Sequence, residues 1–259
     1  MPAELLSTSQ GQTLILTLRN PEARNAFDPA IYAAGIEALS VAERTDDVRS
    51  VVITGADGIF SAGGNLQRLQ ARRQEGAEAQ AQGVEGLHSW IETIRTYPKP
   101  VIAAVEGAAA GAGFSLALAC DFIVAARNAA FVMSYCRIGL SPDGGASWSL
   151  ARALPRQLAT EWLMCGDRVE AERLHALGLV NRLSEPGRAL ADALALAATL
   201  NERAPNALAS IKELLSEAPG QTLDAQLGAE RDHFVRNLQH ANAGEGIAAF
   251  LEKRAPRYQ

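Results

Sequence analysis

The sequence predicts an α/β protein that ends in an all-helical region. Strand and helix signals alternate at the start of the chain, with an alternating apolar run at 13–18, a helix pattern at 29–44 and an apolar, β-branched run at 49–54. This strand–helix–strand order is typical of a mostly parallel sheet covered by helices. After about residue 140, helix patterns follow one another to the end. A chain of 259 residues can bury a sizeable core.

The first helix has a clear start signal. Asp28 is a favourable N-cap residue, and Pro29 stands at the first helical position, where its missing N–H costs nothing. We expect this helix to end near Arg44, with Ile31 and Leu39 among its inward residues.

The next segments predict a flap, further strands and a long series of helices. Residues 66–83 are rich in Gln, Arg, Glu and Ala and have a weak apolar face, which indicates a mobile helix or flap. We expect a separate helix at 84–96 and a buried strand at 101–105. Two short strands are expected at 121–125 and 130–134, followed by helices at 146–154, 158–165, 171–177, 187–203, 205–217, 221–239 and 244–254.

Composition and charge narrow the function classes. The sequence is 48% hydrophobic and 20% charged, as in ordinary globular proteins. The formal net charge of −5 disfavours nucleic acid as a partner, because phosphate backbones require a basic surface. With no leader-like segment and no apolar run of about 18 residues, we expect a cytoplasmic protein without a membrane partner. Cys120, Cys136 and Cys165 are widely spaced in apolar surroundings, so we expect buried free thiols and no metal site.

Two expected strand-to-helix turns are rich in glycine, alanine and serine. One runs from Gly107 to Gly113 as Gly-Ala-Ala-Ala-Gly-Ala-Gly, and the other is Phe60-Ser-Ala-Gly-Gly-Asn-Leu66. Small side chains let a ligand approach the backbone, and the free N–H groups at a helix start carry partial positive charge. Such turns suit an anion, or an oxygen atom that becomes anionic during a reaction. Glycines that only permit tight turns and close packing would give the same pattern.

Asp143 is a lone acid in the loop Ile138-Gly-Leu-Ser-Pro-Asp-Gly-Gly145. Apolar residues on both sides could desolvate this carboxyl group and raise its pKa, as at a functional site, and an ordinary turn aspartate is the alternative. Sequence motifs for nucleotide binding and for a serine nucleophile are incomplete around the second turn. Leu116 replaces the third glycine of a dinucleotide-binding fingerprint, and the Gly-Lys-Ser/Thr of a P-loop does not follow. Ser115 is not in the Gly-x-Ser-x-Gly elbow of a serine hydrolase.

In combination, these stretches resemble the crotonase superfamily, the enoyl-CoA hydratase/isomerase family. The resemblance implies a crotonase-like ββα spiral core and a C-terminal helical trimerisation region, assembled as a homotrimer or a hexamer (dimer of trimers). We expect residues 1–195 to form the core with the CoA-thioester site and residues 196–259 to form the oligomerisation region. The matching segments span nearly the whole chain and are 24–26, 60–66, 98–107, 111–121, 131, 139–145, 176–180 and 249–254.

The resemblance also implies the substrate and its site. The substrate would be an acyl-CoA thioester, with no metal and no cofactor, because coenzyme A is part of the substrate. The thioester oxygen would accept hydrogen bonds from the N–H groups of Gly64 and Ala112. The other residues implied in substrate binding are Arg24, Ala26, Ala62, Gly63, Asn65, Leu66, Gly111, Ser115 and Tyr135, with Phe250 and Lys253 from a neighbouring subunit.

Departures from the family pattern indicate the reaction. Family hydratases carry two glutamates at positions occupied here by Ser115 and Tyr135, and neither is an ionised carboxylate at neutral pH. Asp143 stands where enoyl-CoA isomerases of the phenylacetate-degradation type carry their working aspartate. We therefore expect an isomerase that converts a 3-enoyl-CoA to a 2-enoyl-CoA, with Asp143 as the acid/base and the dienolate oxygen held by the two N–H groups.

Three other functions stay open from the sequence. The nearest is a 2-enoyl-CoA hydratase that adds water with a single acid. A serine hydrolase of the same fold would use Ser115 as its nucleophile, and it would need a histidine that none of the matching segments contains. The third is a non-catalytic RNA-binding relative, which the acidic net charge disfavours.

Overall fold

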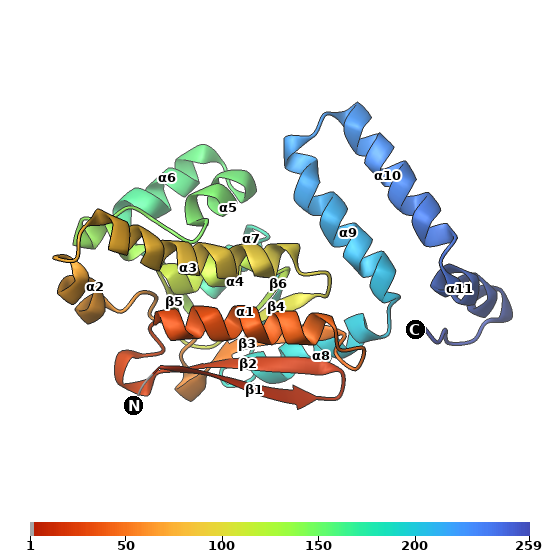
Figure 1. Cartoon of the computed structure of the whole chain (residues 1–259), viewed down its shortest axis with the longest axis horizontal. Coiled ribbons are helices and arrows are strands. Elements are labelled where there is room, and N and C mark those ends of the chain that lie inside the picture. Colours follow the sequence, from red (N-terminus) through yellow and green to blue (C-terminus); the bar gives the residue numbers. More distant parts are fainter. Residues whose placement is uncertain (1–2) are drawn as a thin grey trace.

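The computed structural model describes residues 3–259, and these residues form two β-sheets (Figure 1). The larger sheet has the strand order β1-β2-β3-β4-β6-β9, in which β1 is antiparallel to β2 and the other neighbours are parallel. The smaller sheet has the order β5-β7-β8. The strands are β1 (Glu4–Gln10), β2 (Thr13–Arg19), β3 (Ser50–Gly55), β4 (Val101–Val105), β5 (Ala108–Ala110), β6 (Phe122–Ala126), β7 (Ala130–Val132), β8 (Arg168–Glu170) and β9 (Arg182–Ser184).

Helices cover both faces of the larger sheet. Alternate residues of a strand point to opposite faces, so Val51 and Ile53 of β3 join the core under α1 and α3, while Val52 joins the core under α8. The α-helices are α1 (Pro29–Glu43), α2 (Leu66–Arg72), α3 (Ala77–Thr96), α4 (Ala112–Ala119), α5 (Ala146–Ala153), α6 (Arg156–Cys165), α7 (Ala171–Ala176), α8 (Ala189–Asn201), α9 (Pro205–Glu217), α10 (Leu223–Leu238) and α11 (Ala241–Glu252).

Many of the expected elements are confirmed. The Asp28 side chain caps α1 by accepting a hydrogen bond from the N–H of Ala30 at 3.1 Å. The strands expected at 13–18, 49–54 and 101–105 are β2, β3 and β4, and the helices from α5 to α11 begin and end within a few residues of their expected limits. The signals used for these elements are local, which is why the sequence alone places them.

The helix boundary expected at 83/84 is wrong. α2 ends at Arg72, and α3 begins after Gly76, whose φ of +89° breaks the helix there. Residues 77–83 are the first two turns of α3, and they show a weak apolar face because the buried residues of this helix begin at Leu87.

Four short or exposed strands were not predicted. A direct turn was expected from β4 to α4, but β5 lies between them and pairs with β7. Three alanines carry little strand propensity, so this strand exists because of its partner rather than its own sequence. β8 and β9 have three residues each, and β1 is an exposed edge strand without a strong apolar pattern.

The cysteine prediction is wrong in part. All three cysteines are free, but Cys136 and Cys165 are exposed. Cys136 lies within the short 3-10 helix Ser134–Ile138 and Cys165 ends α6, and the apolar residues near them, Ile138 and Met164, are exposed as well, so apolar neighbours in the sequence do not indicate burial here. Among residues 3–259, no helix combines the length and apolar character needed to cross a membrane.

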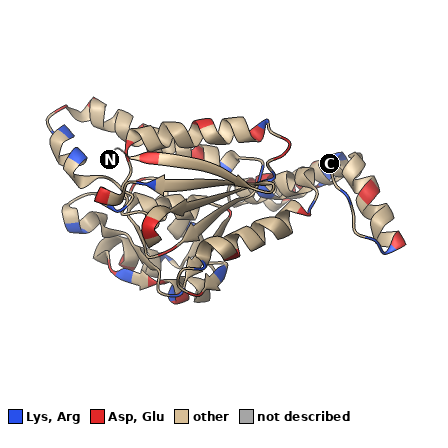
Figure 2. Cartoon of the chain, turned by 90° about the horizontal axis from the view of Figure 1, so that it is seen from below, with Lys and Arg blue, Asp and Glu red and all other residues tan. Residues whose placement is uncertain are grey.

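The helices α9–α11 project away from the sheets (Figure 1). The boundary expected at 195/196 falls inside α8, whose Leu196 and Ala197 pack on the larger sheet, so the projecting part begins at α9. Figure 2 shows basic and acidic residues interspersed over the described chain, including these helices.

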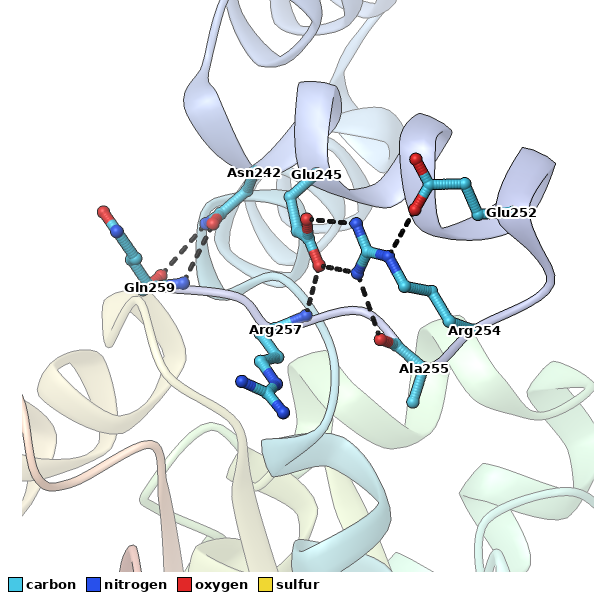
Figure 3. A network of polar contacts seen from close by, with 7 residues as sticks. All are labelled: Asn242, Glu245, Glu252, Arg254, Ala255, Arg257 and Gln259. Atoms are coloured by element: carbon cyan, nitrogen blue, oxygen red, sulfur yellow. Dashed lines mark hydrogen bonds and ion pairs between the residues drawn. The ribbon is translucent and has the colours of Figure 1, made fainter.

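The C-terminal tail folds back against α11 (Figure 3). Glu245 accepts hydrogen bonds from both terminal nitrogens of Arg254, at 2.7 and 2.9 Å, and from the N–H of Arg257 at 2.7 Å. These bonds lower the pKa of Glu245 to about 2, with the Arg254 contact as the main cause. Asn242 exchanges two hydrogen bonds with the backbone of Gln259, so the last residues of the chain are fixed.

Candidate active site

The two small-residue turns lie side by side at one end of the sheets. Ser61 forms an isolated parallel bridge with Ala109, through hydrogen bonds of 3.0 Å to Ala108 and 2.9 Å from Ala110. The two turns are thus close enough to form one site, as expected for turns that share a thioester oxygen, although the intervening strand β5 was not predicted.

Close packing explains the glycine in the first turn. Gly63 has a φ of +85°, and a Cβ atom there would lie 2.4 Å from the oxygen of Ala110 and 3.1 Å from the nitrogen of Ala112. Those distances leave no room for a side chain, so the backbone on either side of Gly63 lies directly against the start of α4.

Gly64 and Ala112 each have a backbone N–H group without a partner among the described residues, and both residues line a shared cavity. Ala112 is the first residue of α4, so its N–H has no partner within the helix. Within residues 3–259, neither N–H donates to a protein acceptor. Both residues line one cavity of about 80 Å³, together with Asp143. An oxygen atom in this cavity would find two backbone donors.

The loop that carries Asp143 is pressed against α4. Gly144 has a φ of +58°, and a Cβ atom there would lie 2.8 Å from the Cβ of Ser115. The Ser115 hydroxyl group, which is buried, donates to the backbone oxygen of Asp143 at 3.0 Å. Ser115 therefore fixes the loop, and it makes no hydrogen bond with a histidine or an acidic side chain in the described residues.

Tyr135 holds one oxygen of the Asp143 carboxylate. Its hydroxyl group donates to Oδ1 of Asp143 at 2.5 Å. Burial, and then the nearby Asp143 carboxylate, raise the pKa of Tyr135, so the phenol stays protonated and remains the donor at neutral pH. Oδ2 of Asp143 makes no hydrogen bond within residues 3–259 and is available to a ligand in the cavity.

The remaining walls come mainly from α1, α2 and α3. Apolar side chains dominate the α3 wall, where Val84 and Leu87 line the cavity. α2 is fastened over the cavity by Arg68, whose guanidinium pairs with Asp28 at 2.5 Å, and by Asn65, whose side chain caps the helix at the N–H of Arg68. Phe27, Tyr32, Arg68, Leu69, Val84 and Leu87 line the cavity and were not predicted as site residues.

Not every predicted residue faces the cavity. Gly64, Asn65, Ala112 and Asp143 line it, and Gly63, Gly111, Ser115 and Tyr135 support those four from behind. Arg24, Ala26 and Ala62 lie in the adjoining loops, where Ala62 donates to the oxygen of Arg24 at 3.0 Å and Ala26 is buried. Leu66 is the exposed first residue of α2.

Phe250 and Lys253 lie apart from the cavity within one chain. They are at the end of α11, at the opposite side of the molecule from α2 (Figure 1). Their expected role belongs to the site of a neighbouring subunit and stays a prediction.

Comparison with known proteins assigns the chain to a family. The profile of the family described as enoyl-CoA hydratase/isomerase matches residues 8–259. The chain belongs to this family. A putative enoyl-CoA hydratase from Thermus thermophilus is 38% identical, over 98% of this chain and 100% of its own length. The 1,2-epoxyphenylacetyl-CoA isomerase of Escherichia coli K12 is 35% identical, over 98% of this chain and 97% of its own.

A solved structure supports the same conclusion. An enoyl-CoA hydratase from Polaromonas sp. JS666 is 70% identical and superimposes with a TM-score of 0.98, covering 98% of this chain and 99% of that one. The crotonase fold expected from the sequence is thus confirmed, and the protein is an enzyme of the crotonase type.

Proposed function

We propose that the protein is an enoyl-CoA isomerase that converts a 3-enoyl-CoA to the 2-enoyl-CoA. The observation that carries this proposal is that Asp143 is the only carboxylate among the described residues that line the cavity of Gly64 and Ala112. One carboxylate is sufficient to move a proton between two carbon atoms, whereas water addition in this family uses two glutamates.

In the proposed mechanism, Oδ2 of Asp143 removes a proton from the α carbon of the substrate. The electron pair of the broken C–H bond moves into the thioester carbonyl, and the enolate oxygen accepts hydrogen bonds from Gly64 and Ala112. Each such donor contributes about 3–4 kcal/mol to the transition state. The same carboxyl group then returns the proton to the γ carbon, and the double bond shifts. No cofactor is needed.

The surroundings of Asp143 favour this proton transfer over exchange with bulk water. The side chains of Phe27, Val84 and Leu87 give the cavity apolar walls. A volume of about 80 Å³ is small beside the roughly 300–1,000 Å³ typical of small-molecule sites, so only the acyl end of a CoA thioester would enter. Exclusion of water strengthens the electrostatic interactions inside.

Hydration of a 2-enoyl-CoA is the second candidate, because the Thermus and Polaromonas relatives are named hydratases. In that reaction Asp143 would have to activate water and supply the second proton alone. Ser115 and Tyr135 offer no further base, since one donates to the backbone of Asp143 and the other to its carboxylate.

The decisive experiment is the Asp143→Asn substitution, which keeps the shape of the side chain. We expect isomerase activity to fall by about 10²–10⁴-fold, because the amide cannot accept the proton. The measurement is conversion of 3-hexenoyl-CoA to 2-hexenoyl-CoA, with hexanoyl-CoA binding as a control that should not change. Near-normal turnover in the variant would contradict the assignment. Loss of crotonyl-CoA absorbance without any 3-hexenoyl-CoA conversion by the wild type would favour the hydratase.

We also propose that α9–α11 join copies of this chain into a trimer or a hexamer. The support is a set of large apolar side chains that are exposed on these helices. They are Ile211, Leu215, Leu223, Leu227, Phe234, Val235, Leu238, Ile247, Phe250 and Leu251. Exposed apolar patches of this kind mark interaction surfaces. In such an assembly Phe250 and Lys253 would lie against the substrate of a neighbouring subunit.

A further inference from the structure

Tyr32 of α1 carries a hydroxyl group that the proposed proton transfer does not use. The residue is only 9% exposed and lines the same cavity as Asp143. Within residues 3–259, this hydroxyl makes no hydrogen bond. The hydroxyl oxygen itself is not sealed off from solvent but opens onto the cavity, where an oxygen atom of a ligand can take the place of hydrating water.

The ring of Tyr32 is held rigidly. Phe27 contacts it edge-on at 5.9 Å between ring centroids, and Trp90 lies at 6.2 Å. On the α3 side, a Cβ atom at Gly86 would lie 3.3 Å from Cδ2 of Tyr32, so the ring packs directly on the helix backbone. The surrounding residues therefore fix the hydroxyl group in one position, as a specific contact with a ligand requires.

The charged groups around Tyr32 define what it can bind. Burial, and then the carboxylates of Asp143 and Asp28, raise the pKa of Tyr32, while Arg68 acts in the opposite direction. The phenol thus stays protonated and is a hydrogen-bond donor. Because Asp28 already neutralises Arg68 at 2.5 Å, an anionic acceptor would meet the uncompensated charge of Asp143. A neutral oxygen atom meets no such repulsion.

We propose that Tyr32 donates a hydrogen bond to a neutral oxygen atom on the acyl group of the substrate. This inference rests on the proposed function in one respect, namely that the acyl end of a CoA thioester occupies the cavity. The preferred substrates are then acyl-CoA thioesters with a carbonyl or ether oxygen beyond the thioester group, rather than plain hydrocarbon chains. Tyr32 is a specificity-determining residue, and Asp143 remains the base.

The test compares the binding of unreactive saturated thioesters by calorimetry. The ligands are hexanoyl-CoA and three oxygenated analogues of the same length, namely 4-oxohexanoyl-CoA, 5-oxohexanoyl-CoA and 4-methoxybutanoyl-CoA. We expect the wild type to bind at least one analogue about two- to tenfold more tightly than hexanoyl-CoA, the range of one net hydrogen bond. Tyr32→Phe should remove this preference and leave hexanoyl-CoA affinity unchanged or increased.

Tyr97→Phe is the matched control. In the described part of the chain, the Tyr97 hydroxyl makes no hydrogen bond either, but it is fully buried and Tyr97 does not line this cavity. This variant should keep the wild-type preference, and thermal unfolding of both variants reports any general effect of the lost hydroxyl. The proposal is overturned if the wild type prefers none of the analogues, if it binds no thioester, or if Tyr32→Phe retains the preference.

Binding of these ligands requires no turnover, so the two proposals can fail separately. A wild-type protein that prefers oxygenated ligands but does not isomerise 3-hexenoyl-CoA would refute only the proposed reaction. A protein that isomerises 3-hexenoyl-CoA with no preference among the saturated ligands would refute only the role of Tyr32.

Discussion

The position of the Asp143 carboxylate depends on residues that do not themselves reach the cavity. Tyr135 occupies Oδ1 with a hydrogen bond of 2.5 Å, and Ser115 fixes the backbone oxygen of the same residue at 3.0 Å. One carboxylate oxygen is thereby held while the other faces the cavity. A base held in this way can serve the α and γ carbon atoms of the substrate with little movement, and this arrangement favours a proton shift over a reaction that needs two separate groups.

Replacement of Tyr135 tests this positioning. Tyr135→Phe removes the hydrogen bond and retains the ring, so we expect kcat for 3-hexenoyl-CoA to fall about tenfold, with a smaller effect on KM. The measurement is steady-state kinetics, which separates the effect on kcat from the effect on KM. A purely structural role of Tyr135 would lower the melting temperature and change kcat and KM together.

The residues of the site differ in how visible they are in the sequence. The two small-residue turns and Asp143 were predicted because small residues after a strand and a lone acid in a glycine-rich loop are local patterns, and the family resemblance then named Gly64 and Ala112 within the turns. Tyr32 was missed because its place on the inward side of an amphipathic helix is also what a core residue would show. Only the cavity beside it and the missing hydrogen bond distinguish the two cases.

Among the elements, the main error of prediction is the start of α3, which the weak apolar face of residues 77–83 concealed. Gly83 and Gly86 lie within this helix. In the structure they allow close packing, since a Cβ at Gly83 would lie 3.3 Å from Arg72 and one at Gly86 would lie 3.3 Å from Tyr32. The break occurs instead at Gly76, whose φ is positive. Helix limits near such glycines depend on tertiary contacts that the sequence does not reveal.

α9 is fastened to the larger sheet by a partly buried ion pair. The ammonium group of Lys212 lies 2.8 Å from Oδ2 of Asp121 and also donates to the oxygen of Ile94 at 2.9 Å. Burial raises the pKa of Asp121, and the contact with Lys212 acts against this increase. Removing the lysine would leave a partly buried carboxylate without its cation. We therefore expect Lys212→Met to reduce the free energy of unfolding at pH 7 by about 3 kcal/mol, measured by urea denaturation.

The pH dependence of this variant has a definite sign. A carboxyl group whose pKa is higher in the folded than in the unfolded state binds its proton more readily when folded, so stability increases as pH falls toward that pKa. The deficit of Lys212→Met relative to the wild type should thus be largest at neutral pH and shrink on acidification. The double variant with Asp121→Asn should be more stable than Lys212→Met alone. An equal deficit at all pH values would show that lost packing, rather than the unpaired charge, causes the effect.

At the scale of the whole molecule, the sequence predicts the layers better than the connections. Buried runs such as 101–105 indicate strands covered on both faces, and the structure has that arrangement. The small sheet was not predicted, because β5 and β8 have three residues each and form only through pairing with β7. A C-terminal helical oligomerisation region was expected from the family resemblance, but the projection of α9–α11 was not, because no local pattern indicates the direction of these helices.

The projecting helix α10 carries a stripe of exposed apolar side chains. Leu223, Leu227, Phe234 and Leu238 are 48–76% exposed and lie on one side of α10 by their helical spacing. Such a stripe is unfavourable in water, so we expect the wild type to sediment as a trimer or hexamer. Changing Leu227 and Phe234 together to Glu places two like charges on this stripe and should yield monomers, observed by sedimentation velocity.

The monomeric variant also tests whether the site is complete in one chain. If Phe250 and Lys253 serve a neighbouring subunit, the double variant should show a KM for 3-hexenoyl-CoA at least about tenfold higher, with a melting temperature that reports the loss of association separately. Gln239→Glu, which adds a charge at the C-cap of α10 and outside this stripe, should leave both the assembly and the KM unchanged. A wild-type protein that sediments as a monomer with full activity would refute the proposed assembly, and the exposed apolar stripe would then require a different partner.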